Sequence, residues 1–465
     1  MPWRESMEPV RMRRVAVLAP RESLRDVLVE VAARGVTELE VATDVDAGAA
    51  SRLLQQVAGA ADTAAVIAHE QPDLHAAANA GRTDLLAGEV ELEARTAAAV
   101  TRGLVTGVLG WMPTDEVTLL AEAIAPLGGA VVPLATPRGF DPPTLLHERG
   151  RLNKSFAPLV DTYATVPYAD IDPTVLAGIA FVVMFGMMFG DAGQGLLLLA
   201  GGLLLRVGRL GRLSAFRPLW LFIAGSGLMA VFFGVLFGEF FGPTGVLPVL
   251  WINPLEEPIL LLEVAIGVGA CLLAGSYVLG TVNRWREGGW RLALVAASGI
   301  AGIAVFLGIG LLALGAYLAF DWLVWTAVVI GVGGLVLTFV GLFAAAGGGA
   351  AGAAEASVEL FNGVMRLGTN IVSFARLAAF GLAHAALGAI VWQGTTGLWA
   401  VGGLAMLAAV ALFLVGNALT FTLEAVVAGV QALRLEYYEL FSRIFVSEGR
   451  PFRPWLVSTT SERVS

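Results

Sequence analysis

Charged residues are scarce in this chain, and that shortage indicates its class. Asp, Glu, Lys and Arg make up only 14% of the 465 residues, whereas hydrophobic residues make up 57%. Soluble domains contain about 25% charged residues, so the composition indicates a membrane protein. The distribution is uneven. Residues 1 to about 172 are mixed and acidic-leaning, and the rest is almost continuous apolar sequence broken by short polar loops.

Several residue types on which enzymes depend are also rare. Cys271 is the single cysteine, which excludes an intramolecular disulfide and argues against redox chemistry. Lys154 is the single lysine and follows Arg-Leu-Asn, so a Walker A phosphate loop is missing. The histidines show no HExxH spacing, and no GxSxG elbow occurs. We therefore expect no bond-making chemistry in this chain, no cofactor, no metal, no nucleic acid and no direct nucleotide binding.

The chain divides into a polar first part and an apolar second part. The first residues are too polar for the apolar core of a signal peptide, so we expect the first domain to stay in the cytoplasm. The composition changes predict a cytosolic α/β domain at 1–150, a linker at 151–173, a transmembrane domain at 174–446 and a cytoplasmic tail at 447–465.

The first domain shows two strand–helix–strand patterns. In residues 12–42, Ser23 is placed to cap a helix and Gly35 to end it before a second apolar run. A second pattern covers 103–134, where Thr114 is placed to cap a helix. These patterns predict two small α/β lobes, joined by a short alanine-rich helical segment.

The apolar part contains seven runs, at 174–207, 218–238, 258–282, 291–318, 323–346, 358–394 and 399–444. A membrane span needs about 20 residues, and the first run, which is longer, is interrupted at 190–195. It is either one tilted helix or a hairpin of two short helices. Basic residues flank it on both sides, and basic loops favour the cytoplasm. Charge therefore predicts the hairpin, with about eight crossings and both termini cytoplasmic.

The basic and acidic residues between the runs agree with that count. The residues expected on the cytoplasmic side are Arg151, Lys154, Arg206, Arg209, Arg212, Arg217, Arg284, Arg286, Arg291, Arg443, Arg450 and Arg453. Those expected outside are Glu239, Glu256, Glu257 and Asp321. At ~1.5 Å per residue, the last two runs far exceed a ~30 Å hydrocarbon core, so they either protrude or tilt, and tilt is favoured.

Polar residues lie deep inside the last two runs. They are Arg366, Asn370, Ser373, Arg376 and His384 in the seventh run, and Asn417, Thr420, Thr422, Glu424, Gln431, Arg434 and Glu436 in the eighth. A charge at the bilayer centre costs roughly 2.5–3.5 kcal/mol on insertion scales. One interpretation is an ion-pair network that holds two helices together, with Glu424 neutralising an arginine. The favoured one is a water-accessible ion path, because the basic residues outnumber the single deep carboxylate.

The arginines and the titratable residues suit different tasks. An arginine stays protonated, so it cannot relay a proton, but it can attract and deprotonate a carboxylate that moves past it. Glu424 and His384 titrate and are able to carry a relay. For His384, a buried packing role is the alternative.

Four stretches of the chain match ordered sequence signatures. The run NIVSFARLAAFGLAH at 370–384 is similar to N-x-x-S-Y-x-R-L-x-A-L-x-L-A-H, with Phe374 at the usual tyrosine. Residues 423–452 resemble a second signature, including the ten-residue step from Glu424 to Arg434. The third match covers 172–195, and FGVLFGEFFG at 233–242 also fits. Together these stretches resemble the membrane subunit a, also called subunit I, of V-type and A-type rotary ATPases.

The resemblance implies a mainly α-helical polytopic stator subunit that faces a ring of proteolipids during proton or sodium transport. It implies that Arg376 and Arg434 oppose the ring carboxylate, that Glu424 and His384 lie along one half-channel, and that water access is lined by Asn370, Ser373, Asn417, Thr420 and Gln431. The implied partners are the ring, the peripheral and central stalk subunits and membrane lipid. The preference for arginine over lysine and the alanine richness favour a prokaryotic plasma membrane. Relatives carry much longer arms in the first domain, which is therefore expected to be shortened here.

Three other functions stay open. A stand-alone secondary transporter often has broken helices in corresponding halves, but a break is visible only in the first half. A structural scaffold has no use for unpaired intramembrane arginines. A relative of the subunit that no longer couples to ATP is the third alternative.

Overall fold

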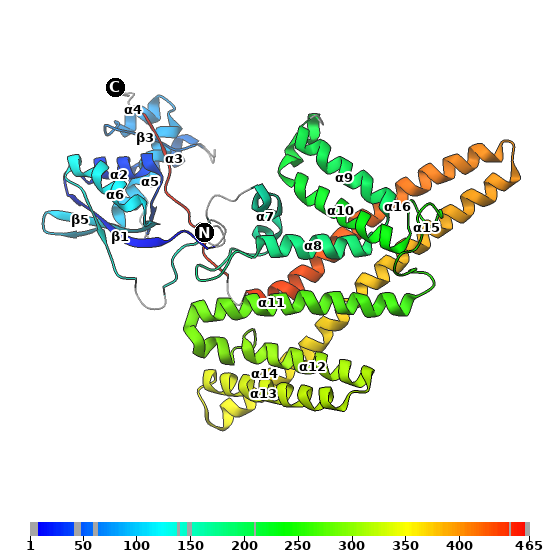
Figure 1. Ribbon diagram of the computed structural model, residues 1–465. Helices are drawn as coiled ribbons and strands as arrows, with labels where there is room; N and C mark the ends of the chain where they lie inside the picture. Colours follow the sequence, from blue (N-terminus) through cyan, green and yellow to red (C-terminus); the bar gives the residue numbers. More distant parts are fainter. Residues whose placement is uncertain are drawn as a thin grey trace. The chain divides into compact units, whose positions relative to one another are not determined.

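The structure is a computed structural model, and it describes residues 8–40, 48–58, 64–136, 140–146, 151–208, 211–445 and 448–460; for 151–153 and 211–214 it describes the backbone alone. Arg209 and the side chains of Arg151 and Arg212 lie outside this description. The chain forms two compact units (Figure 1). One comprises residues 148–448 with 1–8, and the other 9–147 with 449–465.

The smaller unit is built on one antiparallel sheet. Its strands are β1 (Met12–Pro20), β2 (Glu38–Leu39), β5 (Val105–Pro113) and β6 (Ala130–Pro133), in the order β2-β5-β1-β6, and β4 (Val100–Arg102) pairs with β5. Helices α2 (Leu24–Arg34) and α6 (Glu116–Ile124), followed by the short η1 (Ala125–Leu127), pack on it. Val15 and Val17 of β1 share one core with Leu28 and Ile124 of these helices.

The two strand–helix–strand patterns do not form separate lobes, because they interlock in this sheet. β1 and β2 are parallel with β5 between them, and β5 and β6 are parallel with β1 between them. The two strands of each pattern are not neighbours in the sheet, because one strand of the other pattern lies between them. Gly35 ends α2 in the left-handed conformation, at φ 59°, as predicted. Ser23 and Thr114 lie at the expected helix starts, but neither side chain caps its helix.

The segment between the two patterns is mostly helical, as predicted, with α3 (Ala49–Ala58), β3 (Val66–Ala68), α4 (Leu74–Asn79) and α5 (Thr83–Ala97). The end of the chain completes this unit. Strand β7 (Ser458–Thr460) pairs in parallel with β3, and Trp455 and Val457 are buried in the core.

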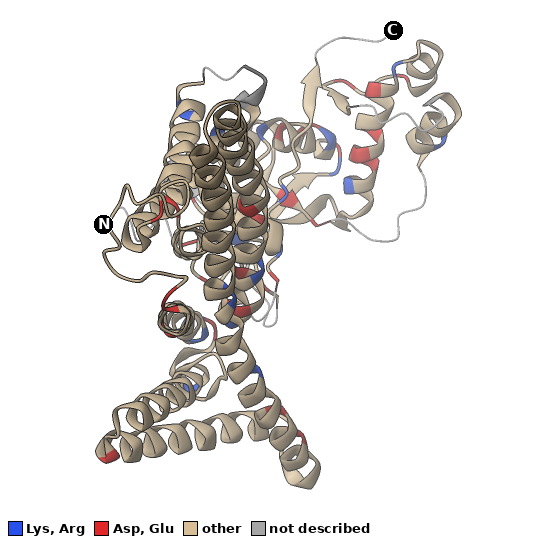
Figure 2. Ribbon diagram, turned by 90° about the vertical axis from the view of Figure 1, so that its right-hand side faces the viewer, with Lys and Arg blue, Asp and Glu red and all other residues tan. Residues whose placement is uncertain are grey.

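The larger unit is helical. After α7 (Arg151–Tyr163) its helices are α8 (Thr174–Met188), α9 (Ala192–Val207), η2 (Gly211–Leu219), α10 (Trp220–Phe237), α11 (Pro258–Val295), α12 (Ile300–Leu318), α13 (Asp321–Ala345), α14 (Gly349–Ser373), α15 (Ala375–Val401), α16 (Ala405–Leu435), the π-helical η3 (Glu436–Phe441) and α17 (Ser442–Ile444). Six described helical stretches are long and apolar enough to cross a membrane, and α8 and α9 are shorter apolar helices. Figure 2 shows the long helices almost free of charge along most of their length.

The first apolar run is a hairpin of two short helices, as the loop charges predict. Gly186 of α8 packs on Met229 of α10 and Gly190 on Phe237, so α8 and α10 run in the same direction. Gly195 of α9 packs on Ala230 of α10, whereas Gly202 packs on Ala224, so α9 runs in the opposite direction. The chain therefore reverses between α8 and α9.

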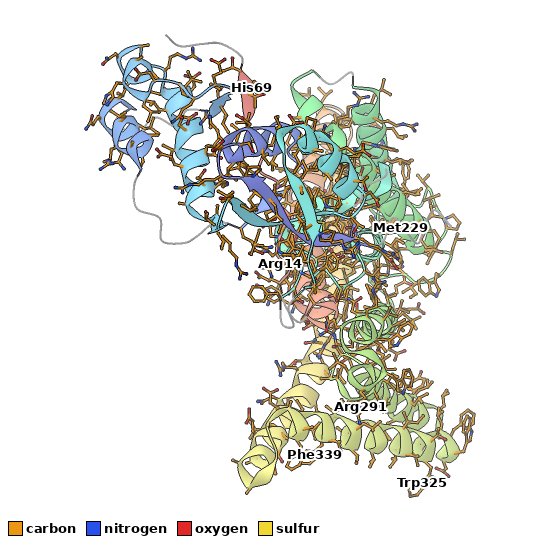
Figure 3. The ribbon with its side chains drawn as sticks, turned by 90° about the vertical axis from the view of Figure 1, so that its left-hand side faces the viewer. Arg14, His69, Met229, Arg291, Trp325 and Phe339 are labelled. Atoms are coloured by element: carbon orange, nitrogen blue, oxygen red, sulfur yellow. The ribbon has the colours of Figure 1, made fainter. Side chains whose placement is uncertain are left out.

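The last two helical stretches are long, as predicted. Residues Gly349–Val401 form one stretch of 53 residues with an interruption at Phe374, and Ala405–Ile444 form one of 40. Their outer parts, α15 and α16, lie side by side, while α12, α13 and α14 pack together below them in Figure 1. Figure 3 labels Trp325 and Phe339 along α13, where Trp325 is exposed. The tilt of the long helices in a membrane stays a prediction.

Candidate functional site

Most of the polar residues predicted in the last two long stretches gather in two clusters, one of which also contains residues of α9 and of the loops beside it. We call them the His384 cluster, which comprises Asp191, Gln194, Glu239, His384, Asn417, Thr420 and Glu424, and the Arg376 cluster, which comprises Asn370, Ser373, Arg376, Arg434, Glu439 and Arg443. Ten residues separate Glu424 from Arg434 on α16, a rise of about 15 Å at 1.5 Å per residue. The clusters are therefore distinct sites on the same helices.

His384 and Glu424 form the centre of the first cluster. His384 Nδ1 shares a hydrogen bond with Glu424 Oε2, and the ring of Phe189 lies 5.1 Å from the imidazole. The two side chains are only 7% and 12% exposed. A cavity of about 140 Å³ borders both. Glu424 therefore pairs with a histidine across the α15–α16 contact, and not with an arginine as the network interpretation assumed.

Asp191 joins this cluster to the turn between α8 and α9. Its carboxylate accepts hydrogen bonds from the backbone N–H groups of Gln194, Phe241 and Gly242, at 2.8, 3.0 and 2.8 Å. It thus caps α9 and holds the loop after α10. The side-chain amide of Gln194 donates to Asn417 Oδ1 at 3.3 Å, and lies 3.4 Å from Thr420 Oγ1. A polar chain therefore connects α9 to α16.

Glu239 lies at the edge of the same cluster, in the loop that follows α10. Its side chain is 3% exposed, and Oε2 has no hydrogen-bond partner among the described residues. Burial, reinforced by the negative charge of Asp191, raises the pKa of Glu239 to about 7, while His384 opposes the shift. A carboxyl group with such a pKa both binds and releases protons near neutral pH.

The Arg376 cluster lies where α14 meets α15. Phe374 is fully buried at this junction, with its ring in the space that Gly269 of α11 leaves open. With its amide oriented to satisfy both neighbours, Asn370 donates to Glu439 Oε2 at 2.9 Å and accepts from Arg443 Nη2 at 3.3 Å. Glu439 also has a side-chain hydrogen bond with Ser373. The junction thus faces the end of α16.

Glu439 of this cluster belongs to the π-helical η3, which directly continues α16. Its charge interacts with those of Arg376, Arg434 and Arg443. Glu436 of the same segment is fully buried, and neither carboxyl oxygen has a partner among the described residues. π-helical turns are rare and occur frequently at functional sites.

The two arginines that the sequence singles out lack a carboxylate partner at contact distance. Among the described residues, no acidic oxygen lies within 4.0 Å of Arg376 or Arg434. Arg376 Nη2 lies 3.5 Å from Ser373 Oγ, and its buried Nη1 has no partner in the described part of the chain. A cavity of about 820 Å³ on α14 and α15 borders Arg376, and Arg434 is exposed.

Eight of the nine site residues that the sequence predicts fall in one of the two clusters. Gln431 lies between them on α16, with Oε1 buried and unpaired among the described residues. Sequence reasoning missed Asp191, Glu239, Glu439 and Arg443 as members of the site. Glu239 was detectable as an acid directly after an apolar run, whereas Glu439 was not, because a π-helical turn breaks the 3.6-residue period. The roles of these residues in ion movement stay predictions.

Together, these features define the class of the protein: a polytopic helical membrane protein with two polar clusters on its last long helices. A model of the V-type ATPase 116 kDa subunit family matches residues 98–247. The A-type ATP synthase subunit I of Pyrococcus horikoshii is 26% identical over 365 residues, covering 75% of this chain and 53% of that protein. The protein of that name from Aeropyrum pernix is 31% identical over 348 residues, covering 65% of this chain and 50% of its own length.

A third relative, the A-type ATP synthase subunit I of Halobacterium salinarum, is 26% identical over 453 residues, covering 74% of this chain and 60% of its own length. The resemblance to V-type and A-type ATPase membrane subunits that the motifs indicate is therefore confirmed by a family model and by relatives that match much of the chain. It spans about half the length of the curated relatives it matches.

Proposed function

We propose that this chain is the ion-translocating stator subunit of a rotary ATPase. In this role the His384 cluster and the Arg376 cluster belong to two half-channels that open on opposite sides of the membrane. The loop charges put the turn beside Asp191 and Glu239 outside and the end of α16 inside, which matches that arrangement. The ion is a proton or sodium, and the protein lies in a prokaryotic plasma membrane with both termini cytoplasmic.

The observation that carries the proposal is the charge of Arg376, which has no carboxylate oxygen within 4.0 Å among the described residues. Arg376 is half-buried, and a cation at membrane depth is costly unless a partner neutralises it. A carboxyl group on a moving proteolipid ring is such a partner: it loses its proton beside the arginine and regains one before it enters lipid. Because an arginine keeps its own proton, it also blocks direct leakage between the half-channels.

The exposed apolar face of α15 and α16 fits a ring of proteolipids. Large side chains such as Leu407, Leu414 and Val426 are more than half exposed there, and they lie on the same stretch as the polar residues that face inward. The peripheral and central stalk subunits are the further partners of the proposed complex.

The first prediction concerns Arg376→Gln. The variant is expected to assemble normally but to lose ATP-driven ion pumping, because its side chain carries no charge with which to deprotonate the ring carboxyl group. The measurement is ATP-driven acidification of inverted membrane vesicles, or sodium uptake where sodium is the ion, combined with co-purification of the nucleotide-binding subunits.

Arg366→Gln is the matched control, because Arg366 lies on α14, is exposed and pairs with Glu359 of the same helix at 3.7 Å. We expect it to pump normally. Normal pumping by Arg376→Gln would contradict the role assigned to Arg376. Purification of the native chain without proteolipid or nucleotide-binding subunits would favour an uncoupled relative or a secondary transporter.

A further inference from the structure

A basic pocket lies in the larger unit, apart from both polar clusters. It has a volume of about 620 Å³ and is lined by Lys154 and Ser155 of α7, Arg206 of α9, Ala215, Arg217 and Pro218 of η2, and Trp220 of α10. Three cations from three different elements converge on it. None of the described residues that line it is acidic, although the chain as a whole has a net charge of −9.

The three cations are available to a ligand. Lys154, Arg206 and Arg217 are exposed, and no carboxylate of the described residues lies within 4.0 Å of any of them. The guanidinium carbon of Arg206 lies 4.9 Å from the centroid of the Trp220 ring, which fixes the head group of this arginine at the pocket wall. The pocket thus contains three positive charges that no nearby described carboxylate neutralises, and one of them, that of Arg206, is held against Trp220.

The pocket is built on a packed framework. Ser155 donates a hydrogen bond to the carbonyl oxygen of Pro218 at 2.6 Å, which ties α7 to the start of α10. Phe156 packs edge to face on Phe222 at 6.1 Å and fills the space beside Gly178 of α8. Lys154 is therefore held near the two arginines by contacts of its own helix.

The pocket lies where two apolar helices begin or end. Arg206 lies in the last turn of the apolar helix α9, and Arg217 directly precedes the apolar helix α10. Trp220 starts α10, and tryptophan is enriched where a helix meets the membrane–water interface. Basic pockets between transmembrane helices on the cytoplasmic side suit anionic phospholipid head groups, and arginine and lysine are the usual partners of phosphate.

We propose that this pocket binds the phosphodiester head group of an anionic glycerophospholipid from the cytoplasmic leaflet. Lys154 and Arg217 contact the phosphate oxygens, Arg206 contributes the third charge, and Trp220 packs against the glycerol backbone. The bound lipid links α7 to the α9–α10 pair. Topology signals alone require basic residues, but they do not require three of them to converge on one pocket.

The test counts lipids bound to the full-length chain by native mass spectrometry, after equilibration with nanodiscs of phosphatidylcholine that contain phosphatidylglycerol. We expect the wild type to retain phosphatidylglycerol in preference to phosphatidylcholine. Lys154→Gln and Arg217→Gln are each expected to weaken retention about fivefold, since one basic residue near the surface contributes about 1 kcal/mol. Lys154→Arg keeps the positive charge and is expected to retain the lipid. Comparison with Lys154→Gln then distinguishes the loss of charge from misfolding.

Arg291→Gln is the charge-matched control, because Arg291, which Figure 3 labels, is exposed near the end of α11 and is not among the residues that line the pocket. It is expected to bind as the wild type does. Equal retention by Lys154→Gln, Arg217→Gln and Arg291→Gln would overturn the proposal, as would equal retention of phosphatidylcholine. If excess inorganic phosphate displaced the lipid, the proposal of a lipid ligand would be overturned, and free phosphate would be the ligand of the pocket.

Discussion

At the scale of single residues, Asp170 shows how burial outside the membrane spans controls a charge. Its side chain is fully buried before α8, and neither carboxyl oxygen accepts a hydrogen bond from a donor in the described part of the chain. Burial, together with the neighbouring carboxyl group of Glu287, raises the pKa of Asp170 to about 7, while Arg284 and Arg286 oppose the shift. Both arginines already form ion pairs with other carboxylates, Arg284 with Glu287 and Arg286 with Glu8.

The pH dependence that follows has a definite sign. Between pH 3.8 and about 7 the folded chain keeps a proton on Asp170 that the unfolded chain releases, so stability falls as the pH rises through this window. Asp170→Asn is expected to remove that fall and to stabilise the protein at pH 8 by on the order of 1–3 kcal/mol, given about 1.4 kcal/mol per pKa unit.

The measurement is thermal unfolding of the wild type and Asp170→Asn at pH 5 and pH 8. Asp321→Asn is the control, since Asp321 is exposed at the start of α13. Its pH dependence should match that of the wild type. An Asp170→Asn variant with an unchanged pH dependence would show that Asp170 is not protonated in the folded state at pH 5.

At the scale of elements, the α9–α10 pair depends on glycines that allow the helix backbones to touch. A Cβ atom on Gly227 of α10 would lie 2.4 Å from the backbone nitrogen of Leu199, and one on Gly234 would lie 2.1 Å from that of Ala192. These are backbone atoms that a rotamer change cannot move. Small residues give helices this close approach in lipid, where van der Waals packing is a main source of association.

Gly227→Ala is therefore expected to separate α9 from α10 and to destabilise the larger unit by about 1–3 kcal/mol, as overpacking does elsewhere. Gly201→Ala on the facing helix is the control, because a Cβ atom there meets nothing within 4 Å. It should be neutral or stabilising by up to about 1 kcal/mol, since alanine favours helix over glycine. Unfolding in mixed micelles measures both, and equal stabilities would contradict the close contact.

At the scale of the whole molecule, the last residues of the chain complete the α/β unit formed by the first residues. Trp455 is 5% exposed; its backbone N–H donates to the Thr37 carbonyl oxygen at 2.9 Å, and its indole N–H donates to Glu91 at 2.6 Å. Val457 N–H donates to the Ala32 carbonyl oxygen at 3.2 Å. The smaller unit therefore closes only after the last membrane helix has been made.

Trp455→Ala is expected to destabilise this unit by about 3–5 kcal/mol, the usual loss for a buried aromatic side chain. Hydrogen exchange of the full-length chain checks this prediction, with faster exchange in β1, β5 and α2 and no change in α12 and α13. Leu456→Ala is the neighbouring control, because Leu456 is 68% exposed. If both variants exchanged alike, the tail would not be part of the core.

Much of this protein is determined by the sequence alone. The apolar runs and the charges of the loops predicted the membrane class and the reversal between α8 and α9, because the cost of burying charge in lipid acts locally along the chain. Asn370, Ser373 and Arg376 recur every three residues inside the seventh run, and helical periodicity, which is a local property, places such residues near one another.

Other features were decided only by the tertiary structure. The pairing of Glu424 with His384, the entry of Glu439 through a π-helical turn and the interlocking of the two strand patterns depend on partners far apart in the chain. The same is true of the basic pocket, where Lys154 meets Arg206 and Arg217. A sequence pattern shows which residues share a face of one element, but packing decides which faces meet and which charges are left without a partner.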